Sequence, residues 1–471
     1  MRKAVKAFTD SVLDLIVQTE ETKDNIVDYY GKPEILYLGP DEQVTPDDIN
    51  WIIGHAARRG YGTPAAFMSS KPRAGINHKE FGVTSEGVNV YLEVAMNRVL
   101  GIDPRKSPFT IKLTGGPDGD VAGNEIKILV REYGDNAKIV GLADVSGCAE
   151  DPNGLEHEEL LRLVREGKSI SHFNESKLGP DGKLSTCDTE EGTKARNTMH
   201  NRVIADAFVP CGGRPNTIDL TNYKQFIQKD GSPSSKLIVE GANLFTTAEA
   251  RKALFDEAGV VIVKDSSANK GGVITSSYEI IAAMLLGEEE FYANKTAIVA
   301  EVLQKLRAFA ELEANLLLTE FETSGGSLPE VSQIISECIN IAKDALSIAL
   351  DDLSEQDHES LLPLFRDHLP KTMADLAFDR VHQRVPVPYI TRAICSSLAS
   401  KLVYREGTSF IQSVPKAKLA STALTYVQKE REIAALIEKL DASELNEKDK
   451  TKITRLLEAG GARTALKVPD L

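Results

Sequence analysis

The sequence has no uninterrupted apolar stretch of about eighteen residues, the length that a membrane-spanning helix requires. It also has no excess of positive charge, because 70 acidic residues against 55 basic ones give a formal net charge of −15. Such a charge disfavours nonspecific attraction to nucleic acid and to anionic lipid. We therefore expect a protein that binds neither nucleic acid nor a membrane, and small-molecule chemistry is the favoured class of function.

Cysteine is scarce as well, and the five cysteines are an odd number without a C-x-x-C pair or zinc-type spacing. This favours reduced thiols and no bound metal. Cys211 and His200 lie close together in the sequence, but ordinary packing is favoured over a catalytic pair, because nothing in the sequence orients them. The cysteines are Cys148, Cys187, Cys211, Cys338 and Cys395.

The N-terminus lacks the apolar segment of a secretory signal. Three of its first six residues are basic, but Asp10 and Asp14 follow at once. We expect a cytoplasmic protein, with the mitochondrial matrix as the alternative.

The length of 471 residues exceeds one compact core and suits two or three domains. In the N-terminal part, apolar spacing predicts a helix over residues 8–30, and a strand is expected over residues 35–38. Another helix is expected to begin after Thr45, since Thr45 offers a capping hydroxyl and Pro46 suits a first turn. Asp47 and Asp48 suit the positive end of its dipole.

From about residue 109 the sequence alternates short apolar strands with helices, which is typical of a largely parallel sheet covered on both faces. Residues 172–201 are polar, and we expect a long surface excursion there. After about residue 287 the sequence is rich in Ala, Leu, Glu and Lys, which predicts a helical region. The predicted strands are 109–113, 137–142, 207–209, 236–239 and 260–263, and the helices between them include 122–133, 155–165 and 247–256.

A glycine-rich turn follows the first of these strands and precedes a helix. Gly116, Gly119 and Gly123 would let backbone amides approach a pyrophosphate, whose charge is stabilised at a helix N-terminus. The spacing is longer than G-x-G-x-x-G and includes Asp118 and Asp120. Taken alone, the turn is equally well interpreted as a tight loop with an aspartate cap.

The next strand ends at Asp144, about twenty residues beyond Gly123, where dinucleotide-binding folds carry an acid. Such an acid accepts hydrogen bonds from the ribose 2′-hydroxyl of NAD and repels the 2′-phosphate of NADP. The turn and the acid together favour dinucleotide binding, with NAD preferred.

Two asparagine motifs resemble the C-terminal domain of glutamate dehydrogenases. Residues 239–243 read Val-Glu-Gly-Ala-Asn and residues 269–273 read Asn-Lys-Gly-Gly-Val, in the family's order. The turn at 114–125 and the segments 196–200, 211–216 and 385–389 resemble the large NAD-specific subclass. The resemblance implies a Rossmann-like, doubly wound α/β domain over 81–287. A partial substrate domain over 1–80 would precede it, and a helical C-terminal region over 288–471 would follow.

The resemblance also implies roles for individual residues. Asp41, in a Gly-Pro-Asp segment, would be the acid/base that exchanges a proton with the substrate amine. Asn243 and Asn269 would hold the nicotinamide, and Thr84 would touch it as well. Ser276 would reach the substrate carboxyl or its side chain. Without the resemblance, asparagines beside glycines are more often turn formers.

The family's two substrate-binding lysines, one of them in K-G-G-x-R, precede the catalytic aspartate, and the forty residues before Asp41 contain no such motif. Lys270 lies in a Lys-Gly-Gly of the cofactor segment and is not that lysine. Without a cation for the α-carboxylate, weak turnover is expected from this chain alone. The chain would then be the C-terminal portion of a longer or split enzyme, or the partner of a polypeptide that supplies the missing half. A catalytically idle NAD-binding regulatory subunit is the alternative.

The resemblance implies NAD-dependent oxidative deamination of L-glutamate to 2-oxoglutarate and ammonia. A dehydrogenase of leucine, phenylalanine or valine is the competing enzyme, because it shares this cofactor domain. The family forms symmetric oligomers, so a homo-oligomer is also implied.

Overall fold

A computed structural model describes residues 2–17, 36–40, 44–351 and 355–466. The chain forms two compact units. Unit 1 comprises Met1–Phe321, Gly325–Pro329 and Leu369–Val385, and unit 2 comprises Glu322–Ser324, Glu330–His368 and Pro386–Leu471. The region predicted to be helical after residue 287 is thereby divided between the two units.

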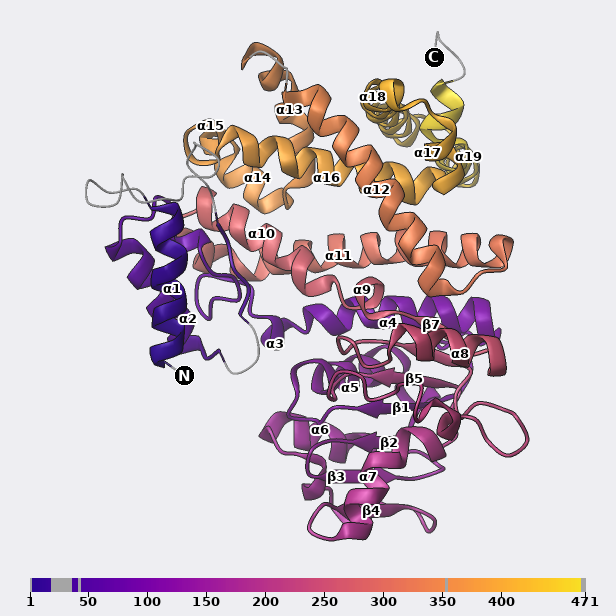
Figure 1. Ribbon diagram of the computed structural model, residues 1–471. Coiled ribbons are helices and arrows are strands. Elements are labelled where there is room, and N and C mark those ends of the chain that lie inside the picture. Colours follow the sequence, from indigo (N-terminus) through magenta and orange to yellow (C-terminus); the bar gives the residue numbers. More distant parts are fainter. Residues whose placement is uncertain (1, 18–35, 41–43, 352–354, 467–471) are drawn as a thin grey trace. The chain divides into compact units, whose positions relative to one another are not determined.

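The centre of unit 1 is a seven-stranded sheet in the order β4-β3-β2-β1-β5-β6-β7 (Figure 1). The five strands from β2 to β7 in this order run parallel, while β3 and β4 are antiparallel additions at one edge. The chain moves from β1 outward to β2 and later returns to β5 on the other side of β1. The five predicted strands and the doubly wound, Rossmann-like class are confirmed. The strands are β1 (Phe109–Thr114), β2 (Ala137–Ala143), β3 (Gly147–Glu150), β4 (Lys183–Thr186), β5 (Ala207–Pro210), β6 (Leu237–Val239) and β7 (Val261–Val263).

Helices cover the sheet because right-handed crossovers in two directions from β1 place them on opposite faces. Helix α7 covers the face onto which Lys112 and Gly141 point, two residues that are paired in register on β1 and β2. The Lys112 ammonium donates to the Val203 carbonyl at 2.7 Å, and a Cβ on Gly141 would lie 2.9 Å from the sulfur of Met199. The covering helices are α5 (Asp120–Tyr133), α6 (His157–Glu166), α7 (Glu190–Arg202) and α8 (Ala248–Ala258).

The prediction of a surface excursion over residues 172–201 was wrong, because this segment contains β4 and most of α7. Helix α7 is capped by Thr189, whose hydroxyl accepts from the Gly192 amide at 3.0 Å. A Cβ on Gly192 would lie under 3.0 Å from the Thr186 carbonyl, so the helix packs directly on the end of β4. The helix was not predicted because its composition is polar. Only one of its sides is buried, at Met199 and neighbouring residues.

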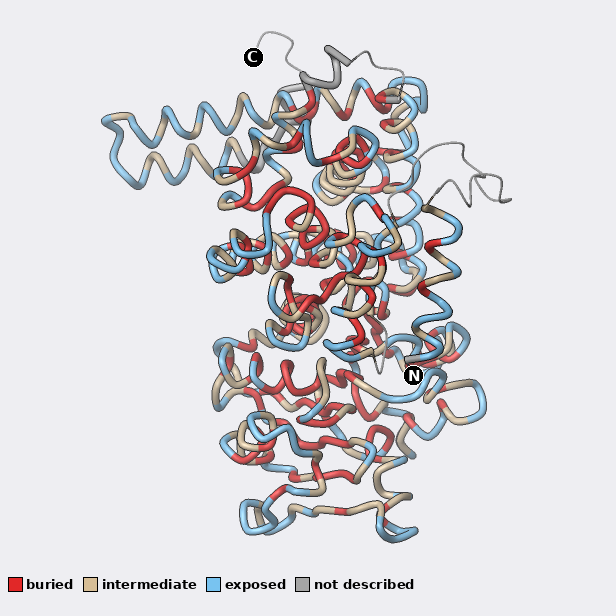
Figure 2. Tube along the Cα trace, turned by 90° about the vertical axis from the view of Figure 1, so that its left-hand side faces the viewer, coloured by how far each residue is buried: buried red, intermediate tan, exposed pale blue. Residues whose placement is uncertain are grey.

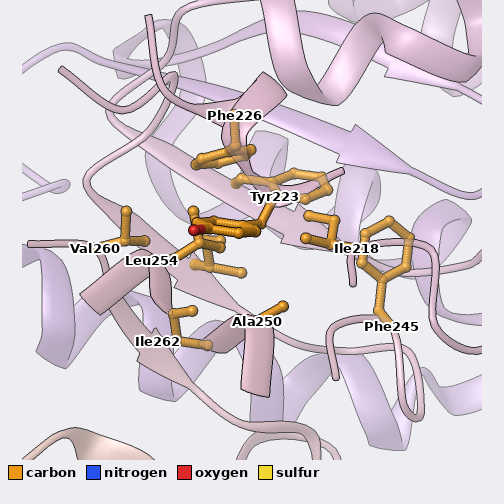
Figure 3. Packing of buried hydrophobic residues seen from close by; sticks show 10 residues of the cluster. Ile218, Tyr223, Phe226, Phe245, Ala250, Leu254, Val260 and Ile262 are labelled. Carbon is orange, nitrogen blue, oxygen red and sulfur yellow. The ribbon is translucent and has the colours of Figure 1, made fainter. Parts of the chain in front are cut away.

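An aromatic cluster fills the space beside β5, β6 and β7 (Figure 3). Phe208 on β5 packs edge-on against Phe245, with ring centroids 5.6 Å apart, and its centroid lies 6.2 Å from that of Phe226. Figure 2 shows buried residues running through this sheet region and exposed residues on its periphery. The cluster includes Ile238 of β6 and Ile262 of β7, the strands that precede the two asparagine motifs. Its other members are Ile218, Tyr223, Ala250, Leu254 and Val260.

The N-terminal part of unit 1 has its own small core around Leu13, Ile49 and Phe67. The helix predicted after Thr45 is confirmed, and its capping box joins the Thr45 hydroxyl and the Asp48 backbone and carboxylate. The predicted helix over 8–30 is described only to Ile16. In place of the strand predicted over 35–38, the structure has a single β-bridge between Leu38 and Met68. Ile35 lies outside the described residues. The elements here are α1 (Arg2–Ile16), α2 (Pro46–Arg58), α3 (His78–Phe81), α4 (Val83–Ala95) and the π-helical turn Met96–Leu100.

Helices make up the rest of the described chain. In unit 1 these are α9 (Asp265–Ala268), α10 (Gly271–Leu285), most of α11 (Glu288–Ser324), α14 (Lys371–Ala377) and α15 (Val381–Arg384). Unit 2 is built from most of α12 (Leu328–Asp351) and from α13 (Glu355–His368), α16 (Val387–Glu406), α17 (Thr408–Ser413), α18 (Lys416–Asp441) and α19 (Glu447–Leu466). Among the described residues, none of the helices combines the length and apolarity needed to cross a membrane.

Candidate active site

The turn after β1 meets the turn after β5 where the strand order reverses. Gly115 adopts φ +97°, and a Cβ there would lie 2.9 Å from the Gly212 amide nitrogen. Gly212 in turn has room for no side chain, because its Cβ would lie 2.9 Å from the Gly115 Cα. Ligands of doubly wound sheets bind at this reversal point, beyond the carboxyl ends of the strands. The sequence did not single out this glycine pair.

The predicted phosphate glycines shape the start of helix α5. Gly119 is its N-cap, and the Gly119 amide donates to the Gly116 carbonyl at 2.9 Å. A Cβ on Gly123 would lie under 3.0 Å from the Pro117 carbonyl oxygen, which is backbone and cannot swing away. The turn therefore lies directly against the first turn of α5, where the backbone amides and the helix dipole favour an anion.

Asp144 follows β2, as predicted, and lies beside the glycine turn. A Cβ on Gly116 would come 2.6 Å from its Oδ2 atom. The carboxylate is fixed by three donors: the Ser146 amide at 2.7 Å, the Ser146 hydroxyl at 2.6 Å and the Ile170 amide at 2.7 Å. Since each carboxylate oxygen has two lone pairs, acceptor capacity remains for a ribose hydroxyl.

The two predicted asparagines are brought together from segments 26 residues apart in the chain. The Asn269 side-chain amide donates to the Asn243 side-chain oxygen at 2.6 Å and to the Gly241 carbonyl at 3.2 Å. Asn243 is exposed and Asn269 half-buried, so the pair is accessible to a ligand. An amide pair in this position can bind a carboxamide such as that of nicotinamide.

The loop that carries Asn243 contains a backbone conformation that L-residues rarely adopt. Leu244 has φ +55°, and it is 57% exposed, so its side chain does not stabilise the conformation by burial. Its amide donates to the Asp265 carboxylate at 2.8 Å, and its carbonyl accepts from the Asn216 amide at 2.7 Å. A buried ion pair of Arg251 with Glu240 and Asp265 supports this carboxylate. Such local strain is frequent at binding sites.

Ser276, on the second turn of α10, contacts two residues that the sequence did not single out. Its hydroxyl donates to the Ser69 hydroxyl at 3.1 Å and lies 3.3 Å from the Nε2 atom of His78. A Cβ on Gly272 would lie 3.4 Å from the His78 ring and 3.5 Å from the Thr84 hydroxyl. Thr84 and Ser276, both predicted, therefore belong to one cluster around the imidazole of His78.

The segment that carries Ser69 and His78 is tied to α10 by one buried carboxylate. Glu279 accepts from the amides of Ser70, Lys71 and Ile76 at 2.9–3.1 Å, and the Lys71 ammonium lies 2.7 Å from it. Ser70 has φ +61°, so these bonds hold a strained backbone. The sequence could not predict that Glu279 binds this segment, because its partners lie more than 200 residues away in the chain.

The Lys-Gly-Gly of the cofactor segment has a structural explanation. The Lys270 ammonium contacts both carboxylate oxygens of Glu313 on α11 at 2.6 Å. A Cβ on Gly271 would lie under 3.0 Å from the Val83 carbonyl, so the glycine lets α4 and α10 approach. Lys270 is thus engaged by a glutamate, in agreement with the prediction that it does not replace the substrate lysine.

Asp41, the predicted acid/base, lies outside the described residues. Its neighbours Gly39 and Pro40 directly follow Leu38, which forms a β-bridge with Met68. Met68 is in turn the residue before Ser69. Gly39 itself is close to the cluster, since a Cβ on it would lie 3.8 Å from the Ser69 hydroxyl.

The alternative pair of Cys211 and His200 has no support in the geometry. His200 stacks on Phe208, with centroids 6.0 Å apart, and burial lowers its pKa to about 4. Burial raises the pKa of the Cys211 thiol well above its ordinary value. Both residues therefore pack in their neutral forms, as the sequence favoured. All five cysteines are free thiols.

A family model described as Glutamate/Leucine/Phenylalanine/Valine dehydrogenase matches residues 75–320, more than half of the chain. The chain belongs to this family. The match thus confirms the resemblance that the asparagine motifs and the glycine turn indicated. The matched residues include Thr84, the glycine turn, Asp144, both asparagines and Ser276.

Curated relatives place the chain near the NAD-specific glutamate dehydrogenases. It is 36% identical over 435 residues to the probable NAD-specific glutamate dehydrogenase of Schizosaccharomyces pombe, covering 86% of this chain and 38% of that protein. It is 37% identical over 439 residues to the NAD-specific glutamate dehydrogenase of Neurospora crassa, covering 87% and 40%. The chain therefore spans only about two fifths of the length of these relatives.

Among solved structures, the hetero-hexameric glutamate dehydrogenase of Thermus thermophilus in a leucine-bound form matches 70% of this chain and 65% of its own. The sequence identity is 19% and the TM-score is 0.48.

Proposed function

We propose that this chain carries the cofactor site and part of the substrate site of an NAD-dependent glutamate dehydrogenase, which converts L-glutamate to 2-oxoglutarate and ammonia. The observation that carries this proposal is the convergence of the glycine turn, Asp144 and the Asn243–Asn269 pair at the carboxyl ends of β1, β2 and β6. Relatives named NAD-specific glutamate dehydrogenase support the choice of both cofactor and substrate.

Each group of the site has one task in this proposal. The turn at Gly116–Gly119 and the α5 N-terminus bind the pyrophosphate, and Asp144 accepts from the ribose. Asn243 and Asn269 orient the nicotinamide, which accepts a hydride from the substrate Cα. Thr84 contacts the nicotinamide as well, and Ser276 lies on the substrate side. Asp41 removes a proton from the substrate ammonium, because hydride leaves Cα only when the nitrogen lone pair is free.

The two lysines that bind the substrate carboxylates in this family come from outside this chain in our proposal. Because the chain spans about two fifths of its relatives, we assign it to the C-terminal part of a longer or split enzyme, which functions as an oligomer. A catalytically idle NAD-binding subunit is the alternative outcome of the following test.

We expect the chain to bind NADH, with the Asn269→Ala variant binding at least about tenfold more weakly, since two hydrogen bonds of the asparagine pair are lost. Titration of NADH fluorescence measures this, and Asn294→Ala is the control, because Asn294 bonds only to its own helix. NADH formation from glutamate is measured in parallel. Binding without turnover, even after addition of the missing portion, would favour the idle subunit, and absence of binding would refute both readings.

Replacing Asp144 by serine is expected to shift the preference from NAD toward NADP by about tenfold or more, because the carboxylate no longer repels the 2′-phosphate. The ratio of dissociation constants for NADH and NADPH is the readout. Asp135→Ser serves as the control, since Asp135 is exposed and precedes β2 rather than following it. An unchanged ratio would show that Asp144 does not lie at the ribose.

A further inference from the structure

We propose that His78 binds a carboxylate of the substrate together with Ser276, and that the imidazole takes up a proton as this carboxylate binds. This inference rests on the proposed function, because it concerns the substrate side of the same site. It names a residue for which neither the motifs nor the relatives' names give a role.

The position of the ring is set by three segments of unit 1. His78 begins α3, directly after the N-cap Asn77, and its backbone amide lies 3.4 Å from the Ser70 hydroxyl. Its Nε2 atom lies 3.3 Å from the Ser276 hydroxyl, which donates to Ser69 at 3.1 Å. An imidazole and two hydroxyls thus lie together. When a carboxylate binds, the Ser276 hydroxyl can turn from Ser69 to donate to it, and the imidazole N–H can donate as well.

The charged groups near the ring include two carboxylates among the described residues. Glu279 on α10 faces the ring, but Lys71 pairs with it. Asp120 on α5 acts electrostatically on the ring as well, and Lys79 and Lys127 act on Asp120. The Lys79 ammonium is directed to the Asp118 carbonyl at 2.8 Å. An arriving carboxylate would therefore meet Asp120 unless the ring becomes charged.

The imidazole is suited to gain its charge on binding. Burial holds the pKa of His78 below its ordinary value, against the opposing effect of Glu279 and Asp120, so the free ring is neutral at pH 7. A carboxylate at hydrogen-bonding distance favours the protonated form and raises this pKa in the complex. A proton then passes from solvent to the ring with each ligand bound. Between the two pKa values, affinity is present at lower pH and is lost as the pH rises.

The test is binding of 2-oxoglutarate to the NADH-loaded protein, measured calorimetrically in the intact protein that contains this chain. We expect uptake of about one proton per ligand near pH 7.5, obtained from the heats in buffers of different ionisation enthalpy, and affinity that weakens up to about tenfold per pH unit. In His78→Gln, which retains a hydrogen-bonding amide without a titratable ring, this uptake should disappear and affinity should fall about tenfold.

The control is His382→Gln, because His382 is an exposed histidine on α15. It should leave the proton uptake unchanged. Absence of uptake in the unaltered protein, or equal uptake in the His78→Gln variant, would overturn the proposal, and the first of these needs no variant to fold. NADH binding is measured in the same samples. Intact NADH binding with no proton uptake would refute the role of His78 alone, whereas loss of NADH binding in the unaltered protein would refute the proposed function.

Discussion

Replacing Glu279 by glutamine is expected to lower the free energy of unfolding of unit 1 by about 3–5 kcal/mol, as when one partner of a buried ion pair is removed. The carboxylate is completely buried and accepts from three backbone amides and the Lys71 ammonium. A glutamine has one acceptor oxygen, and its NH2 group would face donors. Lys71, itself only 8% exposed, would retain a buried charge without a counterion.

Because the chain has two compact units, the loss of stability must be shown to arise in the segment around residues 70–76. Hydrogen exchange of the amides of Ser70, Lys71 and Ile76 reports on it directly, and we expect their protection to collapse before that of β1 and β2. Glu289→Gln is the matched control, because Glu289 pairs with Arg73 while 76% exposed, and such surface pairs contribute little. Unchanged protection in the Glu279 variant would show that the segment is held by other contacts.

Replacing Gly123 by alanine is expected to weaken NADH binding about tenfold or more. The new methyl group would collide with the backbone oxygen of Pro117, so either the glycine turn or the first turn of α5 must shift. Overpacking of this kind costs about 1–3 kcal/mol, and each 1.4 kcal/mol transferred to binding is a factor of about ten. The amides of the glycine turn and of the first turn of α5 would then no longer converge on the pyrophosphate.

NADH titration measures the effect, together with the thermal midpoint of the free variant. Gly62→Ala is the control, since a Cβ at position 62 meets no atom within 4 Å. If Gly123→Ala binds NADH as tightly as the unaltered chain, the turn does not hold the pyrophosphate. A lower thermal midpoint with unchanged affinity would assign the glycine to folding alone.

The strands of the sheet could be predicted because their signals are local. Strands β1, β2, β5, β6 and β7 are apolar runs bounded by glycine or polar residues, and burial on both faces requires such runs. Helix α7 was missed for the opposite reason: it is polar, and contacts with β2, β3 and β4 bury one of its sides. The antiparallel edge strands β3 and β4 are four residues each, too short to show an alternation.

The parallel sheet, the glycine turn, the acid at the end of β2 and the family of the two asparagine motifs follow from the amino-acid sequence. Each of these depends on a stretch of a few residues, whose spacing the backbone geometry dictates. The bond of Asn269 to Asn243 and the contact of Gly115 with Gly212 follow only from the folded arrangement, as does the meeting of His78, Ser69 and Ser276. These contacts join segments separated by up to about two hundred residues, and no local pattern specifies which distant partner a buried polar group will find.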